Sequence, residues 1–454
     1  MYLCTFNKLR QFNPGSIQIP GSKSQSNRML ILAHQTKAKF NSISNLSDSR
    51  DTQILMSALN KLDKIKNDIE TNVDFFQWTH YQLQDHEVSQ LNNQVSNQLQ
   101  DEYFDFHDAG TPARLILAYF SALGVLTKLT GNDSLNKRSM QPLIDVLESG
   151  GAKFEFLQHS GYFPLSITRG LFKFPTLPID RTLSSQYVSA LMLIAPLFPD
   201  KKVIHLEGHE HSNSYIRMTQ KCLSDCGIHV DFEKDNITIS GNKIDFPNQY
   251  TIEGDWSSAS YFFQVCALNQ NSTLYLTNLF QHSCQGDAAC VRFFEDLGVS
   301  TSFDKTGCLI NQNRSVVAEL NWDLSDVPDL APTLIATACA LNIGGRIKGI
   351  QNLIYKESNR IQAINETINQ LGYQICESSE SFDEYYLQKT QMSHVPSTIH
   401  VRTHADHRIA MAFAPLSTKM YVILDDIDCV EKSFPNFWNE LKKCNFELVP
   451  NESQ

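Results

Sequence analysis

The sequence predicts an α/β fold built from repeated subdomains. Four segments each combine an amphipathic helix, a glycine at its end and an alternating apolar strand, and their glycines are Gly151, Gly227, Gly298 and Gly372. Glycine after a helix favours the left-handed cap conformation, and the alternation that follows indicates a strand with one buried face. The glycines are 76, 71 and 74 residues apart, and a period near 74 divides the 454-residue chain about six times.

The composition is that of a folded protein of two to four domains. Apolar residues make up 42% of the chain and charged residues 19%, which is enough to bury a large core. The 38 basic and 49 acidic residues give a net charge of −11, which argues against nucleic acid or an anionic membrane as the main partner. An anion that binds this chain must therefore be held by a local group of Lys and Arg.

The eleven cysteines run from Cys4 to Cys444 without a CxxC pair. Zinc and disulfide frameworks need tighter and repeated spacings, so we expect reduced, buried thiols. The first residues lack a basic flank followed by an apolar core, and no apolar run approaches the ~20 residues of a membrane-spanning helix. These observations predict a cytoplasmic protein.

The segment Asn60–Gln100 is rich in Asn, Gln and Asp and contains neither Gly nor Pro. Its apolar residues show little periodicity. We expect strands with long, exposed polar connections there, and we assign no chemistry to it.

The segment Pro20–Arg28, with the sequence PGSKSQSNR, precedes an apolar helix at Met29–Ala33. A glycine turn and hydroxyls at a helix start predict an anion site, because free N–H groups and the helix dipole point outward there. Lys23 and Arg28 add cations. The spacing does not match a Walker loop, and an ordinary capped helix with exposed cations is the alternative interpretation.

The segment Asp108–Arg114 leads into an apolar helix at Leu115–Leu123. Gly110 lets a ligand approach the backbone closely. The alternative is a plain helix start capped by Asp108 or Thr111.

The segment Ser184–Ser189 opens a hydrophobic helix with three hydroxyls and an amide, which suit a phosphate or a polyol. Capping of the helix is again the alternative. Further on, Lys356 and Arg360 stand four residues apart, so we expect them on one helical face with Glu357 beside them. A solvated charged turn is the alternative for that segment.

Two histidine clusters were considered as metal sites. His404, Asp406 and His407 stand close in sequence, as do His209 and His211. Neither cluster has a further ligand at a conventional spacing, so we predict no metal site.

These segments share small-residue turns, hydroxyls and cations at helix starts. If several such helix starts converge, they form a site for a pair of polyanionic substrates. In chain order the motifs resemble those of the 3-phosphoshikimate 1-carboxyvinyltransferase (5-enolpyruvylshikimate-3-phosphate synthase) family. The matching segments are Gly21–Arg28, Asp108–Arg114, Leu129–Gly131, Lys137–Arg138, Ser184–Gln186, Ser212–Tyr215, Gly254–Tyr261, Gln285–Asp287, Pro328–Asp329, Lys356–Arg360, Asp406–Met411 and Lys432–Pro435.

The resemblance implies two similar inside-out α/β barrel domains, each of three βαβαββ units, with the active site in the cleft between them. Six units agree with the period near 74. One domain is discontinuous and takes residues 1–20 and 254–454, and the other takes residues 21–253.

The resemblance also implies the activity. The enolpyruvyl group of phosphoenolpyruvate is transferred to the 5-hydroxyl of shikimate 3-phosphate by addition and elimination, in the pathway to chorismate and the aromatic amino acids. Addition needs a base for the hydroxyl, Asp329, and an acid for the methylene carbon, Glu357. By resemblance no cofactor or metal is required, the protein is a cytoplasmic monomer acting on small molecules, and glyphosate competes at the phosphoenolpyruvate subsite.

Residue by residue, the resemblance assigns both subsites and places Lys23 near both substrates, as a third catalytic candidate. The shikimate 3-phosphate subsite takes Lys23, Ser24, Arg28, Ser184, Ser185, Gln186, Ser212, Tyr215, Asp329, Asn352 and Lys356. The phosphoenolpyruvate subsite takes Lys23, Gly110, Arg138, Gln186, Arg360, Arg408 and Lys432.

The chain departs from the family pattern at several positions, which bear on affinity and inhibitor sensitivity more than on the reaction. They are Asn359 for Asp, Ser139 for Pro, Asp108 for Asn, Ser134 for an occasional Arg, Trp256 for a small residue and Ile354 for a cation.

Two alternatives were weighed. A UDP-N-acetylglucosamine enolpyruvyl transferase shares the architecture but opens with a KN-type motif and uses a loop cysteine, and this chain has no cysteine between Cys4 and Cys222. A non-catalytic relative is the other alternative, and the intact Lys23, Asp329 and Glu357 argue against it.

Overall fold

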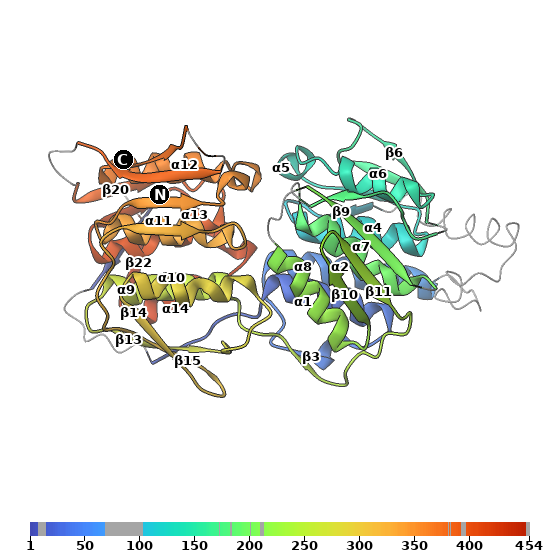
Figure 1. Ribbon diagram of the computed structural model, residues 1–454, viewed down its shortest axis with the longest axis horizontal. Coiled ribbons are helices and arrows are strands. Elements are labelled where there is room, and N and C mark those ends of the chain that lie inside the picture. Colours follow the sequence, from blue (N-terminus) through green and yellow to red (C-terminus); the bar gives the residue numbers. More distant parts are fainter. Residues whose placement is uncertain are drawn as a thin grey trace, which may run out of the picture. The chain divides into compact units, whose positions relative to one another are not determined.

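The computed structural model describes residues 1–7, 15–68, 103–171, 173–181, 184–199, 201–208, 213–379, 381, 383–391 and 396–450. The chain divides into two compact units (Figure 1). Unit 1 comprises Met1–Ser22, Asn45–Ser49 and Ile252–Gln454, and unit 2 comprises Lys23–Ser44 and Arg50–Thr251. The short segment Asn45–Ser49 belongs to unit 1, which the boundaries expected from the motifs did not include.

Five four-stranded sheets share one topology. In each, two neighbouring strands are parallel and the other two form an antiparallel pair. In four sheets this pair is a hairpin whose second strand lies beside the parallel strands, and in the fifth the last and the first strand of the chain form it. Helices connect the first three strands, so each subdomain follows the order βαβαββ. In unit 2 one of them contains β4 (Tyr103–Asp105), α4 (Gly110–Leu123), β5 (Lys128–Thr130), α5 (Asp133–Asn136), α6 (Gln141–Ser149), β6 (Lys153–Phe156) and β7 (Leu165–Arg169).

Two further subdomains complete unit 2. One contains β8 (Ile179–Asp180), α7 (Ser185–Ile194), the 3-10 helix η2 (Ala195–Leu197), β9 (Lys202–Glu207), α8 (Asn213–Asp225), β10 (His229–Glu233) and β11 (Asn236–Ser240). In the other, β12 and β3 form a parallel pair. Its described elements are α1 (Lys23–Gln35), η1 (Phe40–Ser42), β3 (Ile43–Ser44), α2 (Arg50–Asp68) and β12 (Tyr250–Thr251).

Unit 1 repeats the topology three times. The first subdomain contains β2 (Ser16–Ile17), α9 (Trp256–Leu268), β13 (Thr273–Thr277), η3 (Gly286–Ala289), α10 (Cys290–Asp296), β14 (Val299–Phe303) and β15 (Gly307–Gln312). The second contains β16 (Leu320–Asp323), η4 (Pro328–Leu330), α11 (Ala331–Ala340), β17 (Gly345–Lys348), η5 (Gln351–Tyr355), α12 (Arg360–Ile368), η6 (Asn369–Leu371), β18 (Tyr373–Glu377) and β19 (Glu384–Lys389).

The third subdomain of unit 1 joins both ends of the described chain. Its strand β1 lies between β21 and β22, with Tyr2 opposite Leu424 and Leu3 opposite Val449. The elements are β20 (Thr398–Val401), α13 (His407–Phe413), η7 (Ala414–Thr418), β21 (Tyr421–Leu424), η8 (Asp428–Lys432), α14 (Phe437–Lys443), β22 (Phe446–Pro450) and β1 (Tyr2–Phe6).

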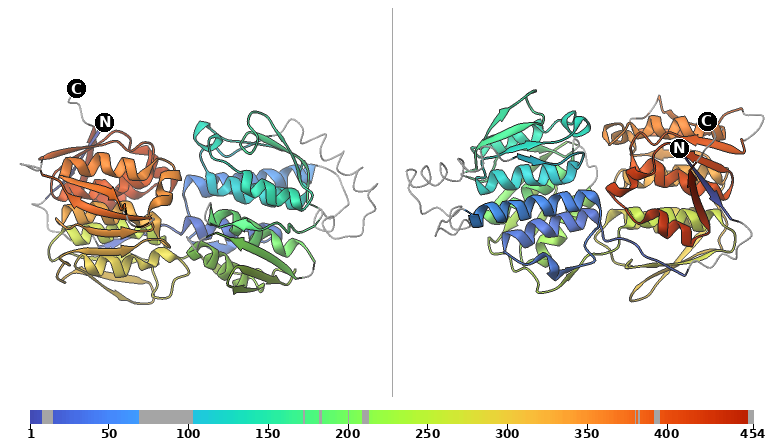
Figure 2. Two further views of the ribbon diagram at one scale, coloured as in Figure 1. Left: turned by 45° about the horizontal axis from the view of Figure 1, so that its top comes forward. Right: turned by 180° about the vertical axis from the view of Figure 1, so that it is seen from behind.

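Buried helices form the core of each unit. Every residue of α9 and of α13 is buried, and such helices must be surrounded by other elements because they have no polar face. In unit 1, α11 packs against both α9 and α13, and in unit 2, α7 packs against α4 and α8. Figure 2 shows the helices of each unit lying side by side in layers with the sheets. This arrangement confirms the predicted two-domain α/β fold.

The four predicted cap glycines are all left-handed, with φ of 101° at Gly151, 76° at Gly227, 92° at Gly298 and 76° at Gly372. That prediction is confirmed. Each glycine follows a helix and precedes the hairpin of its subdomain.

The prediction of strands from residue 60 onward is wrong for residues 60–68, which continue helix α2. Leu55, Leu59 and Leu62 are buried at helical spacing, and this apolar stripe holds the polar sequence in a helix. The remainder of that segment, 69–100, lies outside the described residues.

Candidate active site

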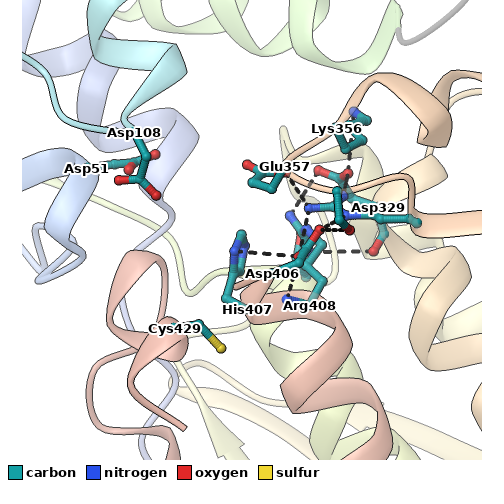
Figure 3. A network of polar contacts seen from close by, with 12 residues as sticks. Asp51, Asp108, Asp329, Lys356, Glu357, Asp406, His407, Arg408 and Cys429 are labelled. Carbon is teal, nitrogen blue, oxygen red and sulfur yellow. Dashed lines mark hydrogen bonds and ion pairs between the residues drawn. The ribbon is translucent and has the colours of Figure 1, made fainter. Parts of the chain in front are cut away.

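Unit 1 gathers three acids and three cations where its second and third subdomains meet. Asp329 lies in η4, Lys356 and Glu357 follow η5, Arg360 opens α12, and Asp406 and Arg408 lie at the start of α13. Asp329, Lys356, Glu357, Asp406 and Arg408 are labelled in Figure 3, with dashed lines for their contacts. We call these six residues the unit 1 cluster.

Arg360 is the centre of this cluster and is only 1% exposed. Its Nε donates to Asp406 Oδ2 at 2.7 Å, its Nη1 to Asp329 Oδ1 at 3.0 Å and its Nη2 to Glu357 Oε2 at 2.7 Å. Burial alone would lower the pKa of Arg360, but these three carboxylates raise it well above its usual range. The rigid guanidinium therefore stays charged and fixes the positions of three acids.

Asp329 contacts all three cations. Arg408 Nη2 donates to its Oδ2 at 2.9 Å, and Lys356 Nζ lies 3.5 Å from its Oδ1. Burial would raise the pKa of Asp329, but Arg408, Lys356 and Arg360 hold that pKa well below its usual range. In this arrangement Asp329 is ionised and is a weak base.

Asp406 lies at the N-terminal end of α13 and binds Arg360 of the cluster. It is wholly buried, caps the helix by accepting from the Arg408 backbone N–H at 3.0 Å, and accepts from Ser358 Oγ at 3.1 Å. Asp406 stands in one of the matching motifs and among the candidate metal ligands, but it is not among the predicted site residues. Its position directly before an apolar helix is the signal that indicates a cap.

The expected helical face shared by Lys356 and Arg360 is wrong. The 3-10 helix η5 ends at Tyr355, and α12 begins only at Arg360. Asn359 caps α12 by accepting from the Gln362 N–H at 3.2 Å. Asn caps a helix about as well as Asp, so this departure from the family pattern preserves the local structure. The two cations still meet, because both contact Asp329.

Two further predicted residues lie in unit 1. Asn352 is in η5, and its Oδ1 is buried without a hydrogen-bond partner in the part of the chain that the structure describes. Lys432 is buried at the end of η8, which packs against α13. Their assignment to the two substrates stays a prediction.

In unit 2 the helix α1 begins at Lys23, within the PGSKSQSNR segment and six residues before the expected start at Met29. Lys23 Nζ donates to Asp51 Oδ2 at 3.1 Å, and Asp51 is buried on α2. The sequence reasoning missed Asp51, because nothing in the local sequence indicates that α2 returns beside α1.

Arg28 is 1% exposed, and four neutral oxygens accept its hydrogen bonds. They belong to Thr219 Oγ1 at 2.7 Å, the Ser24 carbonyl at 2.7 Å, Ser189 Oγ at 2.9 Å and the Tyr215 carbonyl at 3.3 Å. Arg28 thus joins α1 to α7 and α8. The predicted substrate contacts of Arg28, Ser24 and Tyr215 are not tested by this geometry.

Two guanidinium groups converge beside Gly110 in unit 2. A Cβ at Gly110 would lie 2.8 Å from Arg114 Nη1 and 3.1 Å from Arg138 Nη1. Arg114 Nη1 also donates to Gln186 Oε1 at 2.8 Å, and Gln186 Nε2 donates to Thr111 Oγ1 at 3.0 Å. Arg114 stands in a quoted motif but was not among the predicted site residues, because only the fold brings it beside Gln186, 72 residues away.

The start of α4 differs from the capped alternative. Its N-cap is Ala109 and makes no side-chain cap bond, while Asp108 accepts from Arg50 Nη2 at 3.0 and 3.1 Å. Capping by Asp108 or Thr111 is therefore wrong. The uncapped start of this 14-residue helix, with Arg114 and Arg138 beside it, has the chemistry of an anion site.

The start of α7 follows the capping alternative, since Ser184 Oγ accepts from the Gln186 N–H at 3.2 Å. Ser185 is the first residue of α7 and is buried. Ser212 lies outside the described residues.

The described residues contain no group of three His, Cys, Asp or Glu side chains placed to hold a metal ion. His209 and His211 lie outside them. All eleven cysteines are free thiols, and nine of them are buried. No helix in the described ranges is long and apolar enough to cross a membrane.

Known proteins resemble this chain over nearly its whole length. The family model of EPSP synthase (3-phosphoshikimate 1-carboxyvinyltransferase) matches residues 11–441. A 3-phosphoshikimate 1-carboxyvinyltransferase of Bacteroides fragilis (strain YCH46) is 32% identical over 438 residues, covering 96% of this chain and 97% of that protein. One of Sodalis glossinidius is 30% identical over 449 residues, covering 97% of each.

A solved EPSP synthase structure from Acinetobacter baumannii has the same fold, with a TM-score of 0.70 at 18% identity, and covers 99% of this chain and 100% of that one. The match of the family model across residues 11–441 and the identity above 30% with curated relatives decide the family. The chain belongs to the EPSP synthase (3-phosphoshikimate 1-carboxyvinyltransferase) family.

Proposed function

We propose that this protein transfers the enolpyruvyl group of phosphoenolpyruvate to the 5-hydroxyl of shikimate 3-phosphate and releases phosphate. The observation that carries the proposal is the unit 1 cluster, in which one buried guanidinium binds Asp329 and Glu357 together. These are the two acids that the family resemblance assigns to proton transfer. Membership of the EPSP synthase family supports the same reaction.

The substrates carry two phosphates and two carboxylates, so they need several cations. We assign Lys23, Ser24, Arg28, Ser184, Ser185, Gln186, Ser212, Tyr215, Asp329, Asn352 and Lys356 to shikimate 3-phosphate. We assign Lys23, Gly110, Arg138, Gln186, Arg360, Arg408 and Lys432 to phosphoenolpyruvate. Arg114 Nη1 lies within 2.8 Å of the Gly110 Cβ position, which supports adding Arg114 to the second group.

In the addition step, the 5-oxygen forms a bond to C2 of phosphoenolpyruvate while Asp329 accepts the hydroxyl proton. As substrate anions engage Arg408 and Lys356, these cations hold Asp329 less strongly, so its pKa rises toward a value useful for a base. Glu357 donates a proton to the methylene carbon, which becomes a methyl group.

In the elimination step, the bond from C2 to the phosphate oxygen breaks, and the proton that Asp329 accepted passes to the leaving phosphate. Glu357 takes a proton back from the methyl group, and the carbon–carbon double bond re-forms. The cations around the phosphate stabilise the charge that develops on the leaving oxygen. Lys23, which Asp51 holds at 3.1 Å, is the third group that we place at the reacting atoms.

We further propose that the protein works as a cytoplasmic monomer on these two small molecules. Glyphosate, a phosphonate, then competes with phosphoenolpyruvate beside Gly110. The free thiols of the described chain are compatible with a reducing compartment.

The proposed function is tested by release of phosphate from phosphoenolpyruvate. We expect release only when shikimate 3-phosphate is also present, with enolpyruvyl transfer detected by mass spectrometry. UDP-N-acetylglucosamine in place of shikimate 3-phosphate serves as the acceptor control and should give no release. Absence of release with both substrates, or release with the control acceptor, would contradict the proposal.

A further inference from the structure

Asp287 is a buried carboxylate that takes no part in the steps above. It lies in η3 and is 6% exposed. Its Oδ2 accepts a short hydrogen bond from the hydroxyl of Ser257, the second residue of α9. A buried acid usually has a partner that compensates its desolvation, and a single hydroxyl compensates a full negative charge poorly. The groups around Asp287 therefore decide whether its carboxyl is ionised.

Ser257 connects Asp287 to the unit 1 cluster. Arg408 Nη2 donates to Ser257 Oγ at 3.4 Å and to Asp329 Oδ2 at 2.9 Å. A serine hydroxyl has one proton, so donation to Asp287 leaves only its lone pairs for Arg408. The carboxylate of Asp287 thus orients the hydroxyl as an acceptor for the guanidinium.

We propose that Asp287 is a positioning residue, which acts through Ser257 on Arg408 and sets how strongly Arg408 binds the anionic substrate at neutral pH. The inference rests on the proposed function, in which Arg408 contacts phosphoenolpyruvate. It adds a residue to that site and predicts a dependence on pH.

The ionisation of Asp287 changes in the neutral range. The pKa of Asp287 is raised to about 7. Burial is the main cause, Asp329 and Asp255 contribute to the rise, and Arg408 and the Ser257 hydrogen bond oppose it. Asp329 comes from η4, Asp255 caps α9 and Arg408 comes from α13. On the neighbouring α10, burial raises the pKa of the Cys290 thiol well above its usual range, so that group stays neutral.

The sign of the coupling follows from these charges. An anion on Arg408 offsets the cation that stabilises ionised Asp287, so binding raises the pKa of Asp287 and takes up a proton. By reciprocity, protonated Asp287 favours anion binding, and the affinity for phosphoenolpyruvate falls as pH rises through about 7. A coupling of 0.5–1 pKa unit changes the affinity roughly threefold to tenfold.

The test is the KM for phosphoenolpyruvate between pH 6 and 8.5 in the wild type and in Asp287→Asn. Asn still accepts from Ser257 but cannot ionise, so we expect the ratio of wild-type KM to variant KM to rise roughly threefold to tenfold across this range. The titration of the substrate itself cancels in the ratio. The KM for shikimate 3-phosphate should stay within about twofold.

Two more variants separate positioning from a general structural effect. Ser257→Ala removes the acceptor of Arg408 and should raise the KM for phosphoenolpyruvate roughly threefold to tenfold at every pH, since hydrogen bonds to charged groups are worth that much or more. Asp296→Asn is the matched control. Asp296 is on α10 and accepts a hydrogen bond from Trp322 Nε1 at 2.9 Å, so the pH profile of this variant should follow that of the wild type.

Parallel pH profiles of the wild type and Asp287→Asn would overturn the inference, as would equal changes in KM for both substrates. If Asp287→Asn does not fold, Ser257→Ala decides alone: an unchanged KM for phosphoenolpyruvate refutes the link. A wild type that releases no phosphate with both substrates refutes the proposed function instead.

Discussion

The two units differ in what holds the guanidinium groups of their candidate sites. In the unit 1 cluster, Arg360 and Arg408 donate to carboxylates at 2.7–3.0 Å. In unit 2, Arg28 donates to hydroxyls and backbone carbonyls, and Arg114 donates to the amide oxygen of Gln186. Both arrangements fix a guanidinium, one through charged acceptors and the other through neutral ones.

This difference suggests that the two units have different roles in the proposed reaction. A carboxylate that is locked to several cations, as Asp329 is, stays ionised and is a weak base, and its pKa changes when a substrate anion competes for the same cations. A guanidinium held by a neutral amide, as Arg114 is by Gln186, offers its charge to a phosphate directly. On this account unit 1 carries the proton transfers and unit 2 contributes mainly to binding.

The largest expected effect comes from Glu357→Gln. Gln still accepts from Arg360, so the variant should fold and bind shikimate 3-phosphate normally, but it cannot protonate the methylene carbon. We expect turnover to fall about 10²–10⁴-fold. In deuterated water the variant should also lose deuterium incorporation into phosphoenolpyruvate, which mass spectrometry detects. Normal incorporation would show that another group carries this proton.

The comparison of pairings is tested by Arg360→Met and Arg114→Met. The first removes the cation shared by the buried Asp406 and the partly buried Asp329 and Glu357, so the free energy of unfolding should fall by about 3–5 kcal/mol. The second breaks a bond to a neutral amide and should cost about 1 kcal/mol. Chemical denaturation at pH 7.5 measures both. Equal losses would mean that acid and neutral pairing stabilise the two units alike.

Asp287→Asn should also change the free energy of unfolding, and the pKa of Asp287 in the folded protein decides whether the variant is more or less stable. The folded-state pKa of about 7 exceeds the ordinary value of 3.8, so the contribution of Asp287 to stability is present at low pH and is lost as pH rises through about 7. We expect the variant to be more stable than the wild type by roughly 3–5 kcal/mol at pH 8, since each pKa unit corresponds to about 1.4 kcal/mol. Calorimetric melting at pH 8 and near pH 4 should show this difference disappearing at the lower pH.

The smallest effect is expected for Gly110→Ala in unit 2. The new Cβ lies 2.8 Å from Arg114 Nη1 and 3.1 Å from Arg138 Nη1. Both atoms are ends of flexible side chains, so they can move and folding should be intact. We expect the KM for phosphoenolpyruvate to rise threefold to tenfold, about 1 kcal/mol, and the inhibition constant of glyphosate to rise more. An unchanged KM would argue against an anion subsite beside Gly110.

The repeat architecture could be predicted from the sequence because its signals are local. The cap glycines Gly151, Gly227, Gly298 and Gly372 each act on the helix that precedes them. The Ser184 cap of α7 is local in the same sense. The continuation of helix α2 through residues 60–68 could not be predicted, because polar residues outnumber the apolar ones there and weaken the helical periodicity.

The polar contacts of the candidate site could not be predicted in this way. Asp406 reaches Arg360 across 46 residues, Arg114 reaches Gln186 across 72, and Arg408 reaches Ser257 across 151. Such pairings depend on how the subdomains pack. The i, i+4 spacing of Lys356 and Arg360 was misleading, because Asn359 starts a new helix between them.

In the proposed mechanism Asp329 is the base, and three cations keep its pKa low until substrate anions bind them. The most direct measurement is Asp329→Asn, assayed for turnover and, by calorimetry, for substrate binding, with Asp323→Asn on β16 as the control. The account predicts that turnover falls about 10²–10⁴-fold. Shikimate 3-phosphate affinity should stay within about tenfold, or ~1.4 kcal/mol, and anion binding should not weaken, since a competing carboxylate is gone. Full turnover in Asp329→Asn would contradict the account.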